Sequence, residues 1–200
     1  MKIKPVNQDN WTDFENFFEE KGSPKYCWCM AWRMTKEELK NKKPECKKEY
    51  IKKRVFNNIP IGILLYNSNE IIAWCSISPR ETYKRIAGDK TKNNVWSLVC
   101  FFIKREYRKK GITNILIENA KQYAKENGAE YIEAYPVEEN SPSYRFMGFV
   151  KHFEKAGFKY IKKEGTRRNV MLFKLYPEDE QTEHNKTIKE NCNDSPAQTY

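Results

Sequence analysis

No stretch of the 200-residue sequence is apolar enough to cross a membrane. A spanning helix needs about 18 consecutive apolar residues, and no segment approaches that length. The first five residues, MKIKP, are not followed by the apolar run of a secretory signal. We therefore expect a soluble protein that works in the cytoplasm and has no membrane partner.

Histidine is scarce, and the cysteines are not clustered as they are in a disulfide scaffold. The only two histidines are His152 and His184, and no histidine-based catalytic triad can be argued from them. The six cysteines lack the dense spacing of a small secreted protein, so we expect reduced thiols. Cys27 and Cys29 form a C-x-C pair that fits a metal site or a thiol/disulfide couple, but structural zinc usually takes two such pairs. We favour the absence of a metal, with these cysteines buried as small apolar residues.

Two familiar phosphate-binding motifs are missing, although the charge of the chain favours an anionic partner. The sequence has neither the GxxxxGK[ST] of a nucleotide P-loop nor the GxGxxG of a dinucleotide fold. Its net charge is +10, and residues 177–200 hold six acids and two lysines, a net −4, so residues 1–176 carry +14. Such a basic body suits either nucleic acid or a phosphorylated cofactor, and charge alone does not distinguish them.

Hydrophobic periodicity predicts one α/β domain over residues 1–176, followed by a polar, disordered tail over 177–200. The expected sheet is mixed and flanked by helices, and its centre is the nearly continuous apolar run VWSLVCFFI at 95–103. The expected strands are 3–6, 61–66, 70–78, 95–103, 131–135, 158–161 and 170–176. The expected helices are 10–18, a region at 35–54 broken by Pro44, 112–127 and 144–156.

The junction between strand 95–103 and helix 112–127 predicts an anion site. The first N–H groups of a helix have no partner within it, and the helix dipole makes that end electropositive. Gly111 permits close approach of the backbone, and Thr113 adds a short polar side chain. Five basic side chains are concentrated here: Lys104, Arg105, Arg108, Lys109 and Lys110. A pyrophosphate would fit this segment.

At this segment the sequence resembles the GNAT superfamily of acetyl-coenzyme A-dependent N-acetyltransferases. The superfamily's loop signature, Arg/Gln-x-x-Gly-x-Gly/Ala, reads here as Arg108-x-x-Gly111-x-Thr113, with Thr113 in place of the usual small residue. The flanking segments VWSLVCFFI, EYRKKGI, IEAYPVE and HFEKAGF also match in order. The similarity covers roughly residues 1–176 and is most specific over 95–160.

The resemblance implies that acetyl-coenzyme A lies in a V-shaped opening between strands 95–103 and 131–135. Backbone groups of Phe102 and Ile103 would pair with the pantetheine arm. The pyrophosphate would be held by Arg108 and by the amides of Lys109, Lys110, Gly111, Ile112 and Thr113. The amine would attack the thioester directly in a ternary complex, with a backbone N–H near Phe101 or Phe102 as the oxyanion donor.

The catalytic acid and base remain open at the level of sequence. Many members of the superfamily use a tyrosine as the acid, but the corresponding residue here is Phe153, which has no proton to give. Tyr144, Tyr135 or the thiol of Cys100 could substitute, or the thiolate could leave unaided. The carboxylates expected near the sheet opening, as candidate bases, are Glu133, Glu138, Glu139 and Glu81.

Acceptor recognition is assigned to the aromatic segment 26–33, in which Trp28, Trp32 and Arg33 are the candidate binding residues. The expected acceptor is a primary amine of a small molecule or peptide, and a homodimer is left open. Two alternatives are kept: a basic nucleic-acid-binding module, which no reader motif supports, and a degenerate fold that binds acyl-coenzyme A without turnover.

Overall fold

A seven-stranded sheet forms the centre of the molecule in the computed structural model, which describes residues 1–176. The predicted tail at 177–200 lies outside the described residues. The strand order is β1-β2-β3-β4-β5-β7-β6, and every neighbouring pair is antiparallel except β4 and β5. The strands are β1 Lys2–Pro5, β2 Ile63–Asn67, β3 Glu70–Pro79, β4 Val95–Ile103, β5 Tyr131–Ala134, β6 Lys159–Glu164 and β7 Arg168–Lys174. The predicted α/β class and mixed, mostly antiparallel sheet are confirmed.

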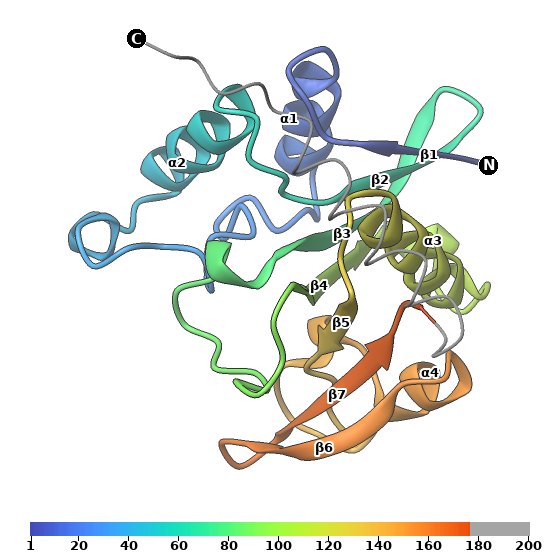
Figure 1. Cartoon of the computed structure of the whole chain (residues 1–200). Helices are drawn as coiled ribbons and strands as arrows, with labels where there is room; N and C mark the ends of the chain where they lie inside the picture. The colour runs from blue at the N-terminus through green and yellow to red at the C-terminus, as the bar shows by residue number, and fades with distance from the viewer. Residues whose placement is uncertain (177–200) are drawn as a thin grey trace, which may run out of the picture.

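Within residues 1–176, four α-helices cover the two faces of the sheet (Figure 1). Helices α1 and α2 enclose one buried cluster with residues such as Trp74, whereas α3 and α4 enclose a second with residues such as Cys75. The alternation of side chains along β3 sends these two neighbours to opposite faces. The helices are α1 Trp11–Glu19, α2 Pro44–Phe56, α3 Ile112–Glu126 and α4 Val150–Lys155. Short 3₁₀ turns occupy Glu38–Lys40, Arg80–Thr82, Arg105–Tyr107 and Arg145–Met147.

Two predicted helical segments differ from the structure. Pro44 does not break a helix but begins α2, at the first helical position where its missing N–H is not needed. The helix predicted over 144–156 is instead a 3₁₀ turn followed by the shorter α4. Gly148 separates them with φ +86°, and a Cβ at this position would lie 2.9 Å from the Phe153 ring. The sequence pattern hid this break because the flanking residues are themselves compatible with a helix.

The sheet splays open between β4 and β5, as the family resemblance implied. The two strands pair only from Val95 to Leu98 on β4, so the rest of β4 has no neighbour on that side. The β3–β4 register also shifts, because Cys100 pairs with Ser76 while Leu98 pairs with the next residue, leaving Val99 as a bulge. The second half of β4 therefore forms an open edge beside the start of α3.

Candidate functional site

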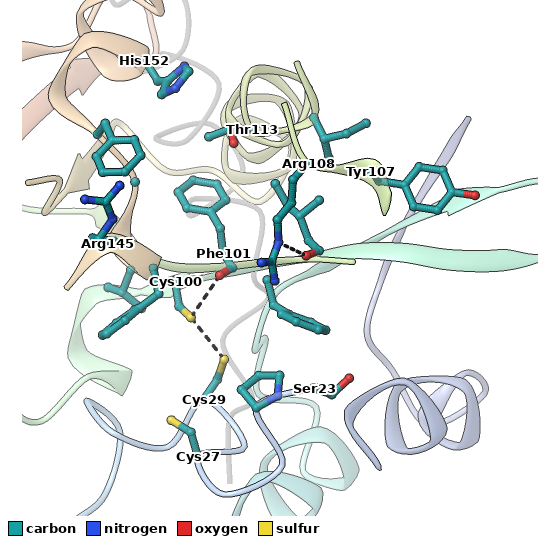
Figure 2. A pocket seen from close by; sticks show the side chains of 18 of the residues that line it. Ser23, Cys27, Cys29, Cys100, Phe101, Tyr107, Arg108, Thr113, Arg145 and His152 are labelled. Carbon is teal, nitrogen blue, oxygen red and sulfur yellow. Dashed lines mark hydrogen bonds between the residues drawn. The ribbon is translucent and has the colours of Figure 1, made fainter. Parts of the chain in front are cut away.

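The open half of β4 forms one wall of a cavity of about 860 Å³. The other walls come from the loop at 22–32, the turn and first residues of α3 at 107–113, and the segment at 145–152. Figure 2 shows the side chains of these segments on both sides of β4. The cavity thus joins the predicted cofactor loop to the predicted acceptor segment.

The register of β4 determines which backbone groups face this cavity. The N–H of Lys104 donates to the carbonyl of Ile72, so these two residues form a hydrogen-bonded pair. In an antiparallel ladder every second pair is hydrogen-bonded, and the next such pair is therefore Phe102 with Trp74. The backbone groups of Phe101 and Ile103 must therefore point away from β3, toward the opening. This alternation corrects the predicted backbone role of Phe102, whose side chain lines the cavity instead.

The basic turn before α3 presents a row of free amides to the cavity. Gly111 caps the helix with φ +75°, and Lys109 also adopts a left-handed conformation with φ +60°. Within residues 1–176, none of the N–H groups of residues 109–113 has a protein acceptor. Arg108 lies beside them, and its Nε donates to the carbonyl of Ile103 at 3.0 Å. Five unpaired donors at an electropositive helix end form a cradle for an anion.

Not every predicted member of this turn reaches the cavity. Arg108, Lys109, Gly111, Ile112 and Thr113 line it. Lys110 does not, and its ammonium group lies 5.5 Å from the centre of the Tyr107 ring.

Of the three residues predicted to bind the acceptor, only Trp32 lines the cavity. Trp28 is 2% exposed and stacks on Phe18 in the core, with ring centres 5.4 Å apart. Arg33 is fully buried, and its guanidinium donates to the Ile61 carbonyl at 2.7 Å. These placements make Trp28 and Arg33 supports for the loop behind the wall that Trp32 forms.

The predicted carboxylate bases lie away from the cavity. Among the described residues, no Asp or Glu lines it. Glu133 is fully buried and faces Arg80, with Oε1 3.0 Å from Nε, while Glu138 is exposed and accepts from Asn169. Glu81 and Glu139 are exposed as well. The carboxylates near the opening thus have structural partners or face solvent.

The residues predicted as the catalytic acid also lie mostly outside the cavity. Tyr144 is 36% exposed outside the cavity, with its ring 6.1 Å from that of Trp32. Tyr135 is buried and donates to Glu133, and burial is the main cause that raises its pKa above the ordinary range. Phe153 is buried against Phe101. Cys100 is the one predicted acid whose side chain borders the cavity.

The residues that line the cavity without a catalytic or binding role predicted from the sequence include Cys29, Arg145 and His152. Cys29 Sγ lies 3.6 Å from Cys100 Sγ, although the two residues are 71 positions apart. His152 Nδ1 lies 2.9 Å from Asn114 Oδ1 at the start of α3. No local sequence signal identifies such contacts, because each joins segments that meet only in the folded chain.

No set of three or more metal-ligating side chains is placed to hold an ion within residues 1–176. In the same part of the chain, no helix has the length and apolar character required to span a bilayer.

Comparison with known proteins identifies a family and a fold. A model of the acetyltransferase (GNAT) family matches residues 5–149. No curated protein matches the chain. Similar solved structures include PaiA N-acetyltransferase from Thermoplasma acidophilum in complex with coenzyme A, at 18% identity and TM-score 0.50, with 86% of this chain and 98% of that chain covered. Another is YncA from Salmonella typhimurium, a putative acetyltransferase with its cofactor acetyl-coenzyme A, at 11% identity and TM-score 0.54, with 88% and 95% covered.

Proposed function

The chain belongs to the acetyltransferase (GNAT) family, and on that premise we propose that it transfers an acetyl group from acetyl-coenzyme A to a primary amine of a small molecule or peptide. One observation carries the proposal: the unpaired edge of β4 borders the same cavity as four of the five residues with unpaired amides at 109–113, namely Lys109, Gly111, Ile112 and Thr113. A ligand that carries both a phosphate group and an extended amide-bearing arm matches this combination.

The residues present fit acetyl-coenzyme A. The amides at 109–113 and the guanidinium of Arg108 would bind the pyrophosphate, since together they offer neutral and charged donors. The backbone groups of Phe101 and Ile103 would pair with the amides of the pantetheine arm as a neighbouring strand would. When bound, acetyl-coenzyme A supplies the activated acyl group.

The open edge of β4 also suits the chemistry of acyl transfer. The N–H of Phe101 points into the opening, where it can donate to the oxygen that becomes negative as the amine attacks. The nitrogen attacks through its lone pair, so it has to reach the thioester in its neutral form, and no carboxylate of the described residues borders the cavity to take up its proton. We propose direct attack in a ternary complex.

The cavity wall on the acceptor side favours an amine with an apolar body. Trp32, Tyr26 and Phe146 contribute aromatic surface. The charged side chains that border the cavity are cations, among them Lys109 and Arg145. A polycationic acceptor would meet repulsion here without a carboxylate to offset it.

Binding of acetyl-coenzyme A tests the proposal, with Gly111→Asp and Gly111→Asn as a matched pair. Both side chains would enter open space at φ +75°, a conformation that Asp and Asn tolerate similarly, so the pair differs mainly in charge. At 100 times its dissociation constant, acetyl-coenzyme A should stabilise the wild-type protein by about 2.7 kcal/mol in a thermal-unfolding titration. We expect acetyl-coenzyme A to stabilise Gly111→Asn only at higher concentrations than the wild type needs, and not to stabilise Gly111→Asp.

Two outcomes would contradict the proposal. Stabilisation by RNA or DNA, with none by acetyl-coenzyme A, would show that the basic surface serves nucleic acid. Tight binding of acetyl-coenzyme A with no acetyl transfer to any amine of a broad panel would show a binding protein that lacks turnover.

A further inference from the structure

A second arginine borders the cavity, on the other side of Phe101 from Arg108. Arg145 begins the 3₁₀ turn that follows β5, and its side chain lines the cavity. Figure 2 shows the guanidinium groups of Arg145 and Arg108 on opposite sides of Phe101. The pyrophosphate proposed above would contact Arg108, so Arg145 remains available to a second ligand.

The turn that carries Arg145 is packed against β4. Met147 is fully buried in a cluster with Val99 of β4. The next residue, Gly148, lies so close to the Phe101 ring that a Cβ would come 3.2 Å from it. Arg145 therefore extends from a fixed piece of backbone, next to the residue whose N–H would donate to the developing oxyanion.

One side of the Arg145 guanidinium is anchored, and the other side is free. Nη1 donates to the carbonyls of Glu139 at 2.8 Å and Ser141 at 3.3 Å, and Cζ lies 4.9 Å from the centre of the Phe149 ring. Within residues 1–176, Nε and Nη2 have no acceptor. These two nitrogens form the edge of a guanidinium that can bind both oxygens of a carboxylate in parallel.

No carboxylate of the described residues balances the charge of Arg145. Glu139 is the nearest acid in the sequence, but its carboxylate pairs with Lys151. Arg145 itself forms no ion pair in this part of the chain. An exposed guanidinium that is held in place at a cavity without a counter-ion is suited to bind an anionic ligand.

The cavity wall around this cation is aromatic. Tyr26 and Phe146 line the cavity and are 68% and 43% exposed, and Trp32 lines it as well. Large apolar side chains that stay exposed together are typical of a surface that contacts a ligand. A cation beside an aromatic wall favours a ligand that combines a carboxylate with an apolar body.

Building on the acetyl transfer proposed above, we propose that the acceptor is an amino acid with an apolar body, whose carboxylate is bound by Arg145. The Nε–Nη2 edge holds the two carboxylate oxygens, and the aromatic wall packs against the apolar body. The amine is thereby directed to the thioester along β4. Its nitrogen forms the new N–C bond, displaces the thiolate together with the electron pair of the C–S bond, and releases one proton to solvent.

The first test measures the binding of acids that have no amine, so it does not depend on acetyl transfer. 3-Phenylpropionate and 4-methylbenzoate are titrated calorimetrically into the full-length protein, beside 3-phenylpropionamide and 4-methylbenzamide. We expect the wild type to bind at least one acid about tenfold more tightly than its amide, because the amide cannot accept two charged hydrogen bonds. Equal affinity within both pairs, or no binding of either acid at millimolar concentration, would overturn the inference.

Four variants assign the anion to one arginine. Arg145→Gln should remove the preference for the acid, and Arg145→Lys should keep only part of it, because lysine retains the charge but not the paired donors. Arg167→Gln is the matched control, since Arg167 is exposed outside the cavity and its Nη1 lies 2.7 Å from the hydroxyl of Ser143 in the same loop. Acid binding that is lost in Arg108→Ala and retained in Arg145→Gln would assign the anion to the cofactor turn and overturn the inference.

The second test measures acetyl transfer to paired acceptors. Phenylalanine and 4-(aminomethyl)benzoate are compared with phenylalaninamide and 4-(aminomethyl)benzamide. We expect the wild type to favour at least one acid over its amide by about tenfold in kcat/KM, and Arg145→Gln to lose this preference through a higher KM. The amides should react with Arg145→Gln as they do with the wild type, which shows that the variant is folded.

The outcomes distinguish this inference from the function on which it rests. If the wild type acetylates amines with no preference for a carboxylate, the acceptor class alone is overturned. If Arg145→Gln weakens the binding of acetyl-coenzyme A as much as it weakens that of the acids, Arg145 serves the cofactor and the inference is overturned as well. If the wild type binds no acetyl-coenzyme A, the proposed function fails, and acid binding that depends on Arg145 would still establish the carboxylate site.

Discussion

Glu133 and Arg80 form an ion pair inside the domain, with Glu133 Oε1 3.0 Å from Arg80 Nε. The carboxylate is fully buried, and it also accepts hydrogen bonds from the Ser97 hydroxyl at 2.6 Å and from the Asp89 backbone N–H at 3.2 Å. Tyr135 donates to it as well. Glu133 thus joins β4, β5 and the segment after β3, and it has no route to a substrate in the cavity.

Glu133→Gln should therefore lower stability and leave catalysis in the folded protein unchanged. The amide cannot balance the charge of Arg80, and removing one partner of a buried pair costs about 3 kcal/mol. Urea denaturation measures the loss. Glu138→Gln is the control, because Glu138 is exposed and should change stability by less than about 0.5 kcal/mol. A Glu133→Gln protein of wild-type stability with a much reduced rate would instead support the base predicted from sequence.

Arg33→Lys should destabilise the fold without weakening acetyl-coenzyme A binding. The buried guanidinium donates to the carbonyl of Ile61, to two side-chain hydroxyls of β3 and its following turn, and to the Tyr83 hydroxyl, over whose ring it lies at 4.1 Å. The single ammonium group of lysine cannot reach all of these acceptors as the planar guanidinium does. We therefore expect the free energy of unfolding, measured by urea denaturation, to fall by about 3 kcal/mol. Arg85→Lys is the matched control, since Arg85 is exposed and its side chain makes one hydrogen bond within residues 1–176, to the carbonyl of Ala31.

Acetyl transfer assays complete the test of Arg33. A variant that keeps its stability but requires much more amine to reach half its maximal rate would place Arg33 on the acceptor after all.

The sequence predicted the framework of the fold because periodicity is local. The apolar run 95–103 and the helical pattern after Gly111 each carry a signal within one element, and both elements occur where expected. The splay between β4 and β5 came from the family resemblance instead. The bulge at Val99 was not predictable, because its neighbours Leu98 and Cys100 are both apolar and show no change in alternation.

The site was less predictable than the fold, for two physical reasons. A glutamate is usually exposed, so sequence placed Glu133 at the opening although its partners bury it completely. The contact between Cys29 and Cys100 depends on a loop without regular structure meeting the middle of a strand, and no periodicity records such a meeting.

His152 should make the protein less stable in mild acid. Burial is the main cause that lowers its pKa below 6.5, and the charge of Lys151 adds to it. The unfolded chain therefore binds a proton more readily than the folded one, so stability should fall as the pH drops below about 6.5. Melting temperatures at several pH values should show a shallower decline for His152→Gln, which has no proton to gain.

A second variant reverses the sign of this effect. His152 Nδ1 faces Asn114 Oδ1 at 2.9 Å, so Asn114→Asp would place a carboxylate beside the ring and raise the pKa of His152. The loss of stability at acid pH should then shrink or disappear. An unchanged decline in both variants would assign it to other groups.

Arg108 should bind the pyrophosphate of acetyl-coenzyme A, because its guanidinium borders the cavity beside the free amides at 109–113. A hydrogen bond to a charged group contributes about 1.5–3 kcal/mol, so Arg108→Ala should weaken binding roughly tenfold to a hundredfold in a calorimetric titration. Arg105→Ala removes an exposed cation three residues away, outside the cavity, and should have little effect. Raising the ionic strength should narrow the difference in affinity for acetyl-coenzyme A between the wild type and Arg108→Ala.

S-acetyl-pantetheine lacks the pyrophosphate, so the wild type and Arg108→Ala should bind it with the same affinity. A loss of the same size with this fragment would show instead that Arg108 acts through its hydrogen bond to the Ile103 carbonyl, by shaping the edge of β4.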